Sequence, residues 1–240
     1  MLLQSDLELR IIIVLLVQVW PIFYGSYFSY KLLKRAKNRS TFTLSSFFIL
    51  LSLTYFLVTI SIFFFDTPFA YILYIFGIYF FVFSHCFFII FSWVLVKLDD
   101  KTPYWKFRLI ITFYGIISTF VLWIGYFFDG IKYDTNTSWI PTYSLSFLIF
   151  TWITLVVFLL IPQIYYSLKL FKIFEGAKLR RRINMFIISV FLELSVVFAL
   201  FLYNTWVENE IFRLIFIILV PETSTIAAFL IYKSFGKELE

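Results

Sequence analysis

The sequence predicts an all-α, polytopic membrane protein in which residues 1–240 form one domain, a bundle of seven transmembrane helices. The first observation is composition: 62% of the residues are hydrophobic and 14% are charged, whereas a soluble domain carries about 25% charged residues. The second is the presence of seven apolar segments of about 20 residues or more, the length that spans a bilayer as a helix. The predicted spans are residues 9–31, 42–65, 68–97, 107–128, 142–169, 183–206 and 210–233.

The spans follow one another through short polar connections, which leave no room for a separate domain outside the membrane. The first span, 9–31, comes after acidic as well as basic residues, so it lacks the basic leader of a cleavable signal peptide. We therefore expect it to be retained as a helix. The third and fifth spans, 68–97 and 142–169, are longer than a bilayer requires, which predicts that they tilt or extend beyond it.

Basic residues alternate along the chain and predict the orientation of the bundle. All but three of the 20 Lys and Arg residues lie in the first, third and fifth connections or at the C-terminal end, and the three exceptions are Arg10, Lys132 and Arg213. Basic loops stay in the cytoplasm during insertion. The N-terminus is therefore expected outside and the C-terminus inside, in a multi-pass protein of the cell membrane.

The same topology accounts for the formal net charge of +6, so no nucleic-acid partner is expected. The most basic connection runs from Lys169 to Arg182. It is the expected docking surface for a cytoplasmic signalling partner.

A short motif occurs twice. Residues 21–26 read PIFYGS and residues 162–167 read PQIYYS, so both follow the pattern P-x-x-Y-x-S, 141 positions apart. The same offset superposes the second span on the sixth and the third on the seventh. This predicts a repeat of three helices, one linking helix and three helices, with a binding site at the repeat interface, as in many transporters. Pro21 and Pro162 are expected hinges.

The Pro162-Gln163 pair resembles the motif of PQ-loop transporters, which are seven-helix proteins with an outside N-terminus and a proline in the first and fifth spans. The first copy in this chain departs from that motif, since Pro21 is followed by Ile22. The resemblance implies a transporter fold and covers these two stretches alone.

Three ionisable side chains lie inside predicted spans: His85, Glu193 and Glu222. Ionisable groups at membrane depth are costly and are usually functional. Counting about 1.5 Å per residue from one end of the span places Glu193 roughly 16 Å deep and Glu222 roughly 18 Å deep, both near the midplane, and it places His85 at a similar depth. If the last two helices pack side by side, the two carboxyls share one site, which would hold a proton, a cation, a cationic ligand or protonated His85. The alternative is that both acids are protonated and bonded between helices while His85 is a packing residue.

The segment VPETST, residues 220–225, adds a helix-breaking proline and three hydroxyls to this region. Pro221 removes one backbone donor and is the third expected hinge. Thr223, Ser224 and Thr225 are expected to repair the backbone or to bond across to another helix. The candidate ligand or ion site therefore comprises Glu222, Glu193, Thr223, Ser224, Thr225 and His85.

Several classes of function are disfavoured by what the sequence lacks. A single histidine excludes a bis-histidine haem on this chain alone and disfavours a three-histidine zinc enzyme. Neither H-E-x-x-H nor G-x-S-x-G occurs. We therefore expect no catalytic residues, no metal, no cofactor and no enzymatic activity.

The layout of the whole chain resembles the seven-helix receptor or sensor modules found at the N-termini of many prokaryotic signalling proteins. That resemblance implies a sensor that binds a small or lipophilic ligand within the bundle, near Glu222, Glu193 and aromatic residues such as Trp152 and Tyr203, and that signals through its basic cytoplasmic loops. Two alternatives stay open, a proton-coupled transporter of a small solute and a structural subunit of a membrane complex.

Overall fold

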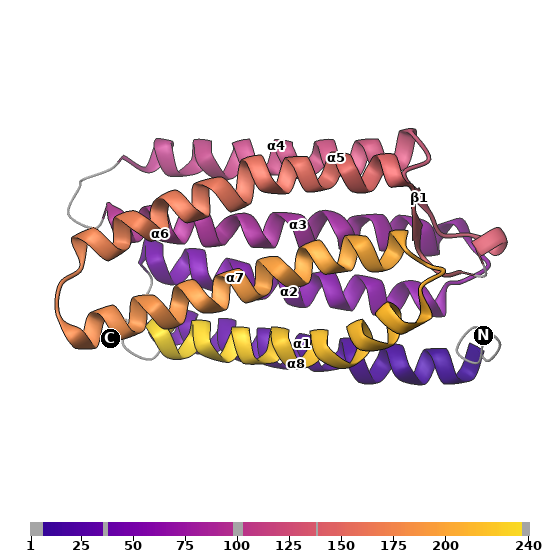
Figure 1. Ribbon diagram of the computed structural model, residues 1–240, viewed down its shortest axis with the longest axis horizontal. Helices are drawn as coiled ribbons and strands as arrows, with labels where there is room; N and C mark the ends of the chain where they lie inside the picture. The colour runs from indigo at the N-terminus through magenta and orange to yellow at the C-terminus, as the bar shows by residue number, and fades with distance from the viewer. Residues whose placement is uncertain (1–6, 36–37, 98–102, 138, 237–240) are drawn as a thin grey trace.

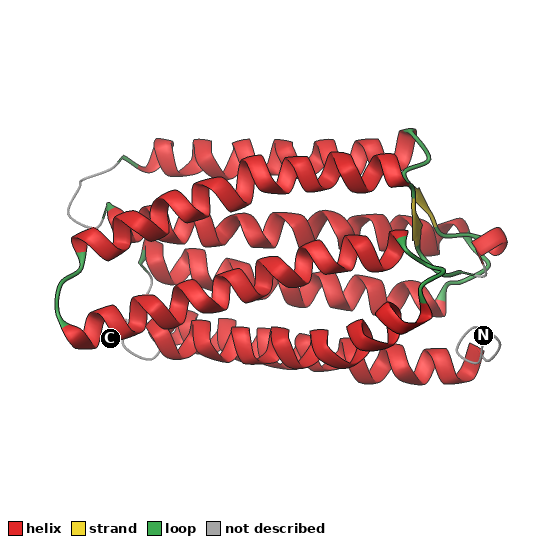
Figure 2. Ribbon diagram, in the orientation of Figure 1, coloured by secondary structure: helices red, strands yellow, loops and turns green. Residues whose placement is uncertain are grey.

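The computed structural model describes residues 7–35, 38–97, 103–137 and 139–236 of the chain. Its helices are α1 (Leu7–Arg35), α2 (Arg39–Phe63), α3 (Pro68–Val96), α4 (Tyr104–Phe127), α5 (Leu145–Leu155), α6 (Ile161–Ile173), α7 (Ala177–Thr205) and α8 (Glu210–Ile231). A π-helical turn, η2 (Val156–Leu160), joins α5 to α6 in one continuous helix, and a second, η3 (Tyr232–Gly236), extends α8. With α5, η2 and α6 taken as one helix, the described chain contains seven long helices, which Figures 1 and 2 show in one orientation.

Six of these helices are long and apolar enough to cross a membrane. They are Arg39–Phe63, Pro68–Val96, Tyr104–Phe127, Leu145–Ile173, Ala177–Thr205 and Glu210–Phe235. The chain is therefore an integral, multi-pass membrane protein with a helical fold, as the sequence predicts. The seventh span and the orientation in the membrane stay predictions.

The seven helices run along one common axis (Figure 1). Helices α4 and α5 form one edge of the bundle, α1 and α8 form the other, and α2, α3 and α7 lie between them. Helix α1 begins at one end of the bundle and α8 finishes at the opposite end. We call these the outer and the inner end, after the predicted orientation.

Helix α3 is the centre of the bundle and contacts α2, α4, α6 and α7. Neighbours surround most of it, and its apolar residues accordingly extend around the helix, although its outer end is partly exposed, for example at Phe69. Aromatic side chains fill the space around it, for example Phe47 of α2 against Phe88 and Phe186 of α7 against Phe91.

A small hairpin closes the outer end between α4 and α5, where no strand was expected. Strand β1 (Ile131–Lys132) pairs antiparallel with β2 (Thr142–Tyr143). Two phenols of α3 hold it: the Tyr71 hydroxyl donates to the carbonyl of Ile131 at 3.1 Å, and the Tyr74 hydroxyl bonds to that of Tyr143 at 2.7 Å. Burial raises the pKa of Tyr143, so this phenol stays protonated and keeps its bond to α3.

Two predicted boundaries were wrong. Strand β2 occupies the start of the predicted fifth span, and the helix begins at Leu145, where the hydroxyl of the N-cap residue Ser144 accepts a hydrogen bond from a backbone N–H. The predicted basic loop from Lys169 to Arg182 is largely helical.

In that region Lys169 belongs to α6 and Arg182 to α7, and the turn between the helices is residues 174–176. Gly176 adopts a φ of 100° there, a conformation that favours glycine. The basic residues prolong both helices because long charged side chains can hold a helix end in the polar layer beside the bilayer.

Candidate functional site

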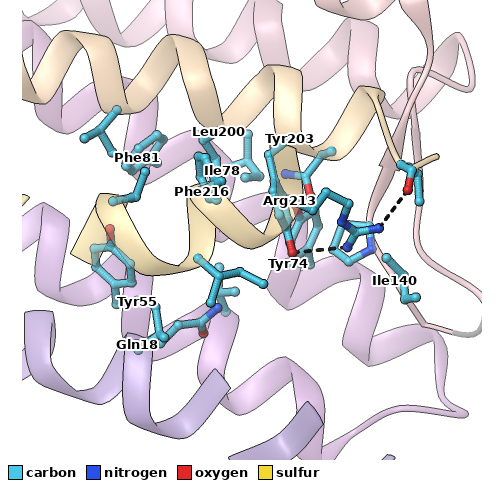
Figure 3. A pocket seen from close by; sticks show the side chains of 18 of the residues that line it. Gln18, Tyr55, Tyr74, Ile78, Phe81, Ile140, Leu200, Tyr203, Arg213 and Phe216 are labelled. Carbon is cyan, nitrogen blue, oxygen red and sulfur yellow. Dashed lines mark hydrogen bonds between the residues drawn. The ribbon is translucent and has the colours of Figure 1, made fainter. Parts of the chain in front are cut away.

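A cavity of about 720 Å³ opens inside the outer half of the bundle (Figure 3). This volume lies within the usual range of small-molecule sites, about 300–1,000 Å³. Five helices supply its wall, with the following residues among the lining: Val17 and Gln18 of α1, Tyr55 and Val58 of α2, Ile78 and Phe81 of α3, Leu200 and Tyr203 of α7, and Phe216 and Pro221 of α8. The wall is mainly apolar, which suits a lipophilic ligand.

The rim of the cavity is polar and lies at the outer end. Arg213 donates to the hydroxyl of Tyr203 at 3.1 Å and to the carbonyl of Val207 at 3.4 Å, and its guanidinium stands over the Tyr203 ring (Figure 3). These bonds fix the first turn of α8 to the end of α7. The exposed side chains of Glu208 and Glu210 lie at the same rim.

A cluster of buried polar side chains joins four helices near the middle of the bundle. Ser224 of α8 donates to Glu193 Oε1 of α7 at 3.0 Å, and the Tyr24 hydroxyl of α1 lies 3.1 Å from Ser224 Oγ. His85 of α3 faces the other carboxyl oxygen, with 3.9 Å between His85 Nε2 and Glu193 Oε2. Three of the predicted site residues, His85, Glu193 and Ser224, therefore meet in one place.

The cluster lies directly below the inner end of the cavity. Phe81 and Val196 line the cavity and sit one helical turn outward from His85 and Glu193 on their respective helices. Tyr55, also in the lining, lies beside Ser224 and the Glu193 carboxyl. A molecule that reaches the cavity floor therefore comes close to the polar cluster.

The structure does not bring Glu222 into this cluster. Helices α7 and α8 pack side by side as expected, but Glu222 is exposed on the surface of the bundle while Ser224 is buried. No hydrogen bond or ion pair joins Glu222 to any residue in the described part of the chain. The two carboxyls do not share a site, because the face of α8 that carries Ser224 packs toward α7 and Glu222 lies on the exposed face of α8.

The two threonines beside Glu222 bond within their own helix. Thr223 donates to the carbonyl of Leu219 at 2.8 Å and Thr225 to the carbonyl of Pro221 at 2.7 Å. The carbonyl that Pro221 deprives of its usual donor is that of Ile217, four residues earlier. The expected backbone repair is therefore not what these hydroxyls do.

The expected hinge prolines stand at three different positions in the bundle. Pro21 lies inside α1, and Pro221 lies inside α8 at the cavity floor. Both helices line the cavity with the segments that precede their prolines, for example at Gln18 and at Phe216. Pro162 is the second residue after the π-helical turn η2, where its missing N–H makes the ordinary helical pattern impossible.

Gln163, beside Pro162, holds the start of α6 against α3. Its amide donates to Ser92 Oγ at 3.1 Å and to Ser167 Oγ at 3.4 Å, and all three side chains are buried. The Pro-Gln pair thus has a structural role next to the helical irregularity. It lies far from the rim of the cavity, on the inner side of the bundle.

Some roles in the cavity and cluster were not predicted from the sequence. Tyr24 is the tyrosine of the PIFYGS motif, but the motif did not indicate Ser224 as its partner, and nothing in the local sequence distinguishes Tyr55 among the 16 tyrosines of the chain. Tyr203 was expected near the ligand and does line the cavity, whereas Trp152 donates to the Phe198 carbonyl at 3.3 Å and is absent from the lining. Within the described residues, no group of three or more His, Cys, Asp or Glu side chains is placed to hold a metal ion.

No protein-family model matches this chain, and no curated protein matches it either. Functional inference therefore rests on the cavity and on the polar cluster below it.

Proposed function

We propose that this chain is a membrane receptor of the sensor type that binds a small lipophilic ligand in the cavity of the bundle. The observation that carries the proposal is the position of the cavity, which opens at the outer end and ends beside a buried polar cluster on α1, α3, α7 and α8. A ligand there would act on four helices at once. Such a site fits a sensor, in which binding must bias the packing of helices.

The shape of the cavity favours a medium-chain amphiphile. Arg213 at the rim and Pro221 at the floor are eight residues apart on α8, so they lie about 12 Å from each other along the helix. The wall between them is mainly apolar and the rim is polar. An alkyl chain would fill the inner part while a polar head stayed at the rim.

The signal would leave the site through α8. Below Pro221, the inner end of this helix packs on three neighbours: Tyr232 stacks on Phe28 of α1 at 4.6 Å, and Phe235 contacts Phe91 of α3 and Phe186 of α7. A change in the tilt of α8 would disturb these contacts. The basic helix ends around the turn at 174–176 are the proposed surface for a cytoplasmic partner.

The proposal is tested by thermal stabilisation with three probes that share one chain and differ in head charge: octanol, octanoate and octylamine. The protein is placed in lipid nanodiscs, and its unfolding temperature is measured with increasing probe. Stabilisation is expected because a ligand that binds the folded state raises its stability by mass action. The probe that stabilises most identifies the preferred head group.

A pair of tryptophan variants controls for binding to lipid. Leu200→Trp fills the cavity, whereas Ile218→Trp adds the same ring on an exposed face of α8 that does not line the cavity. We expect the probe effect to vanish in Leu200→Trp and to persist in Ile218→Trp. An equal probe effect in both variants would refute binding in the cavity.

A second candidate, a proton-coupled transporter, is favoured by the location of the cavity between α1, α2 and α3 on one side and α7 and α8 on the other, with Glu193 and His85 below it. This is where a repeat of three plus three helices would bind its substrate. It predicts solute flux into liposomes driven by a pH gradient and lost in Glu193→Gln. A sensor predicts stabilisation without flux.

A further inference from the structure

A buried histidine and a buried glutamate face each other across a gap in the polar cluster. The relative exposure of His85 is 0% and that of Glu193 is 1%. The facing atoms are His85 Nε2 and Glu193 Oε2, 3.9 Å apart, and neither has a hydrogen-bond partner in the described part of the chain. Buried polar atoms are nearly always paired, so two facing exceptions need an explanation.

The other ring nitrogen of His85, Nδ1, already makes a hydrogen bond. His85 Nδ1 lies 2.7 Å from the backbone carbonyl of Phe81. A carbonyl oxygen can only accept, so Nδ1 carries a hydrogen and donates it. The Ser84 hydroxyl, 3.1 Å from Nδ1, donates to the same carbonyl at 2.7 Å. A proton can therefore be gained or lost on this ring at Nε2, the atom that faces Glu193.

The other carboxyl oxygen of Glu193, Oε1, also has a hydrogen-bond partner. Ser224 donates its hydroxyl hydrogen to Oε1 at 3.0 Å. Since that hydrogen is used, the Tyr24 hydroxyl is the donor in its 3.1 Å bond to Ser224 Oγ. The Ser224 hydroxyl thus points its hydrogen at the carboxyl, and the Tyr24 hydroxyl points its hydrogen at Ser224 Oγ. Any proton that Glu193 carries must sit on Oε2, the atom that faces His85.

The surroundings of the pair are apolar and aromatic. The rings of Phe47, Phe81 and Phe88 lie against the imidazole edge to face, at centroid distances of 5.7, 4.8 and 5.8 Å. The titratable groups that face the pair from other helices are the phenols of Tyr24 on α1 and Tyr55 on α2, while α8 contributes the Ser224 hydroxyl. In such surroundings an uncompensated charge is strongly disfavoured.

The number of protons carried by Nε2 and Oε2 together distinguishes three states of the pair. With no proton, a buried carboxylate faces a nitrogen lone pair. With two, a buried imidazolium faces a neutral acid. With one, the pair is neutral overall and can form a hydrogen bond once the gap narrows by about 1 Å to ordinary hydrogen-bond length. We propose that His85 and Glu193 form a buried proton-binding site that holds one proton between Nε2 and Oε2.

The test uses the fact that the chain contains a single histidine. Isotope-labelled histidine gives NMR signals from the His85 ring alone, and they report directly which ring nitrogens carry hydrogen. The infrared band of protonated carboxylic acid, compared between the wild type and Glu193→Gln, reports whether Glu193 carries a proton. Glu222→Gln is the matched control, because that carboxyl lies at a similar depth on the exposed face.

Between about pH 5 and pH 8, where a free histidine titrates, the wild-type protein in nanodiscs is expected to keep one proton on the pair. Either His85 is charged and Glu193 ionised, or His85 is neutral and Glu193 protonated. Ser224→Ala removes the donor to Oε1, so if His85 is charged in the wild type the variant should shift the proton toward Glu193 and move the His85 signal. Glu222→Gln should leave that signal unchanged.

A pair with no proton or two protons at neutral pH would overturn the proposal, as would a His85 that titrates in this range while Glu193 stays ionised. The wild-type pH series decides this by itself if a variant fails to fold. The outcome does not depend on what the cavity binds.

Discussion

Ser224 connects three helices through one hydroxyl group. It donates to Glu193 on α7, accepts from Tyr24 on α1 and belongs to α8. All three side chains are buried. The bonds are made in surroundings where water cannot replace them, so losing a partner is costly.

Removing this hydroxyl should destabilise the bundle. Ser224→Ala leaves Tyr24 without its acceptor and Glu193 Oε1 without its donor, and each unsatisfied buried group costs about 1–3 kcal/mol. We expect the free energy of unfolding, measured by denaturant titration in mixed micelles, to fall by that order. Ser195→Ala is the control, because Ser195 is exposed on α7 and bonds to its own helix at the Leu192 carbonyl. Equal losses in the two variants would contradict the role given to Ser224.

The depth of these residues could be predicted from the sequence, but their direction around the helix could not. Depth follows from counting residues, because each one rises about 1.5 Å. Direction depends on how the helix packs, and successive side chains are separated by about 100° around a helix with 3.6 residues per turn. Glu222 and Ser224, two residues apart, therefore point to different sides, and no periodicity in an apolar helix indicated which one faces α7. His85 was correctly placed at the depth of Glu193.

At the scale of helices, close approach of α1 and α2 depends on Gly25. A Cβ atom built at this position would collide with Ser52 Oγ and would lie 3.0 Å from the carbonyl of Phe48. The Ser52 hydroxyl already reaches toward the Ile22 carbonyl of α1, at 3.4 Å. The absence of a side chain at Gly25 therefore lets α2 lie close to α1, the helix that carries Tyr24.

A methyl group at position 25 should push α1 and α2 apart. Gly25→Ala is expected to lower the free energy of unfolding by about 1–3 kcal/mol, the usual cost of overpacking. Gly115→Ala is the control, because a Cβ there would meet its nearest neighbour, Phe83, at 3.8 Å, an ordinary contact. If Gly25→Ala proves as stable as Gly115→Ala, the packing argument fails.

The number and order of helices followed from the lengths of the apolar segments, and most helix ends lie within a few residues of the predicted ones, but the start of α7, at Ala177 rather than residue 183, does not. Hydropathy marks the part of a helix that lies in lipid. It does not mark the basic residues from Lys178 to Arg182, which form the first turns of α7. The hairpin at 131–143 was missed because its two-residue strands are too short for any alternation of polar and apolar residues to be recognised.

At the scale of the whole molecule, the structure gathers the basic residues at one end of the bundle. The described Lys and Arg residues near the ends of α1, α3, α6 and α8 and near the starts of α2, α4 and α7 all lie at the inner end. Lys132 and Arg213 lie at the outer end. Such asymmetry is what retention of basic segments in the cytoplasm produces.

The orientation can be tested with single cysteines. Cys86 is the one cysteine of the chain and is buried, so Cys86→Ala gives a background without reactive thiols. In that background, Thr135→Cys in the outer hairpin should react with a membrane-impermeant maleimide on intact cells. Glu175→Cys in the inner turn should react only after the cells have been permeabilised. The opposite labelling pattern would show that the protein is inserted the other way round and would contradict the predicted orientation.

The central claim is that the cavity and the polar cluster below it act together. The most direct test is the NMR signal of His85, recorded in nanodiscs with and without whichever octyl probe stabilises the protein best. We predict that the probe shifts this signal in the wild type and in Ile218→Trp, and that the shift is absent in Leu200→Trp. A probe that stabilises the protein through the cavity but leaves the His85 signal unchanged would contradict the claim.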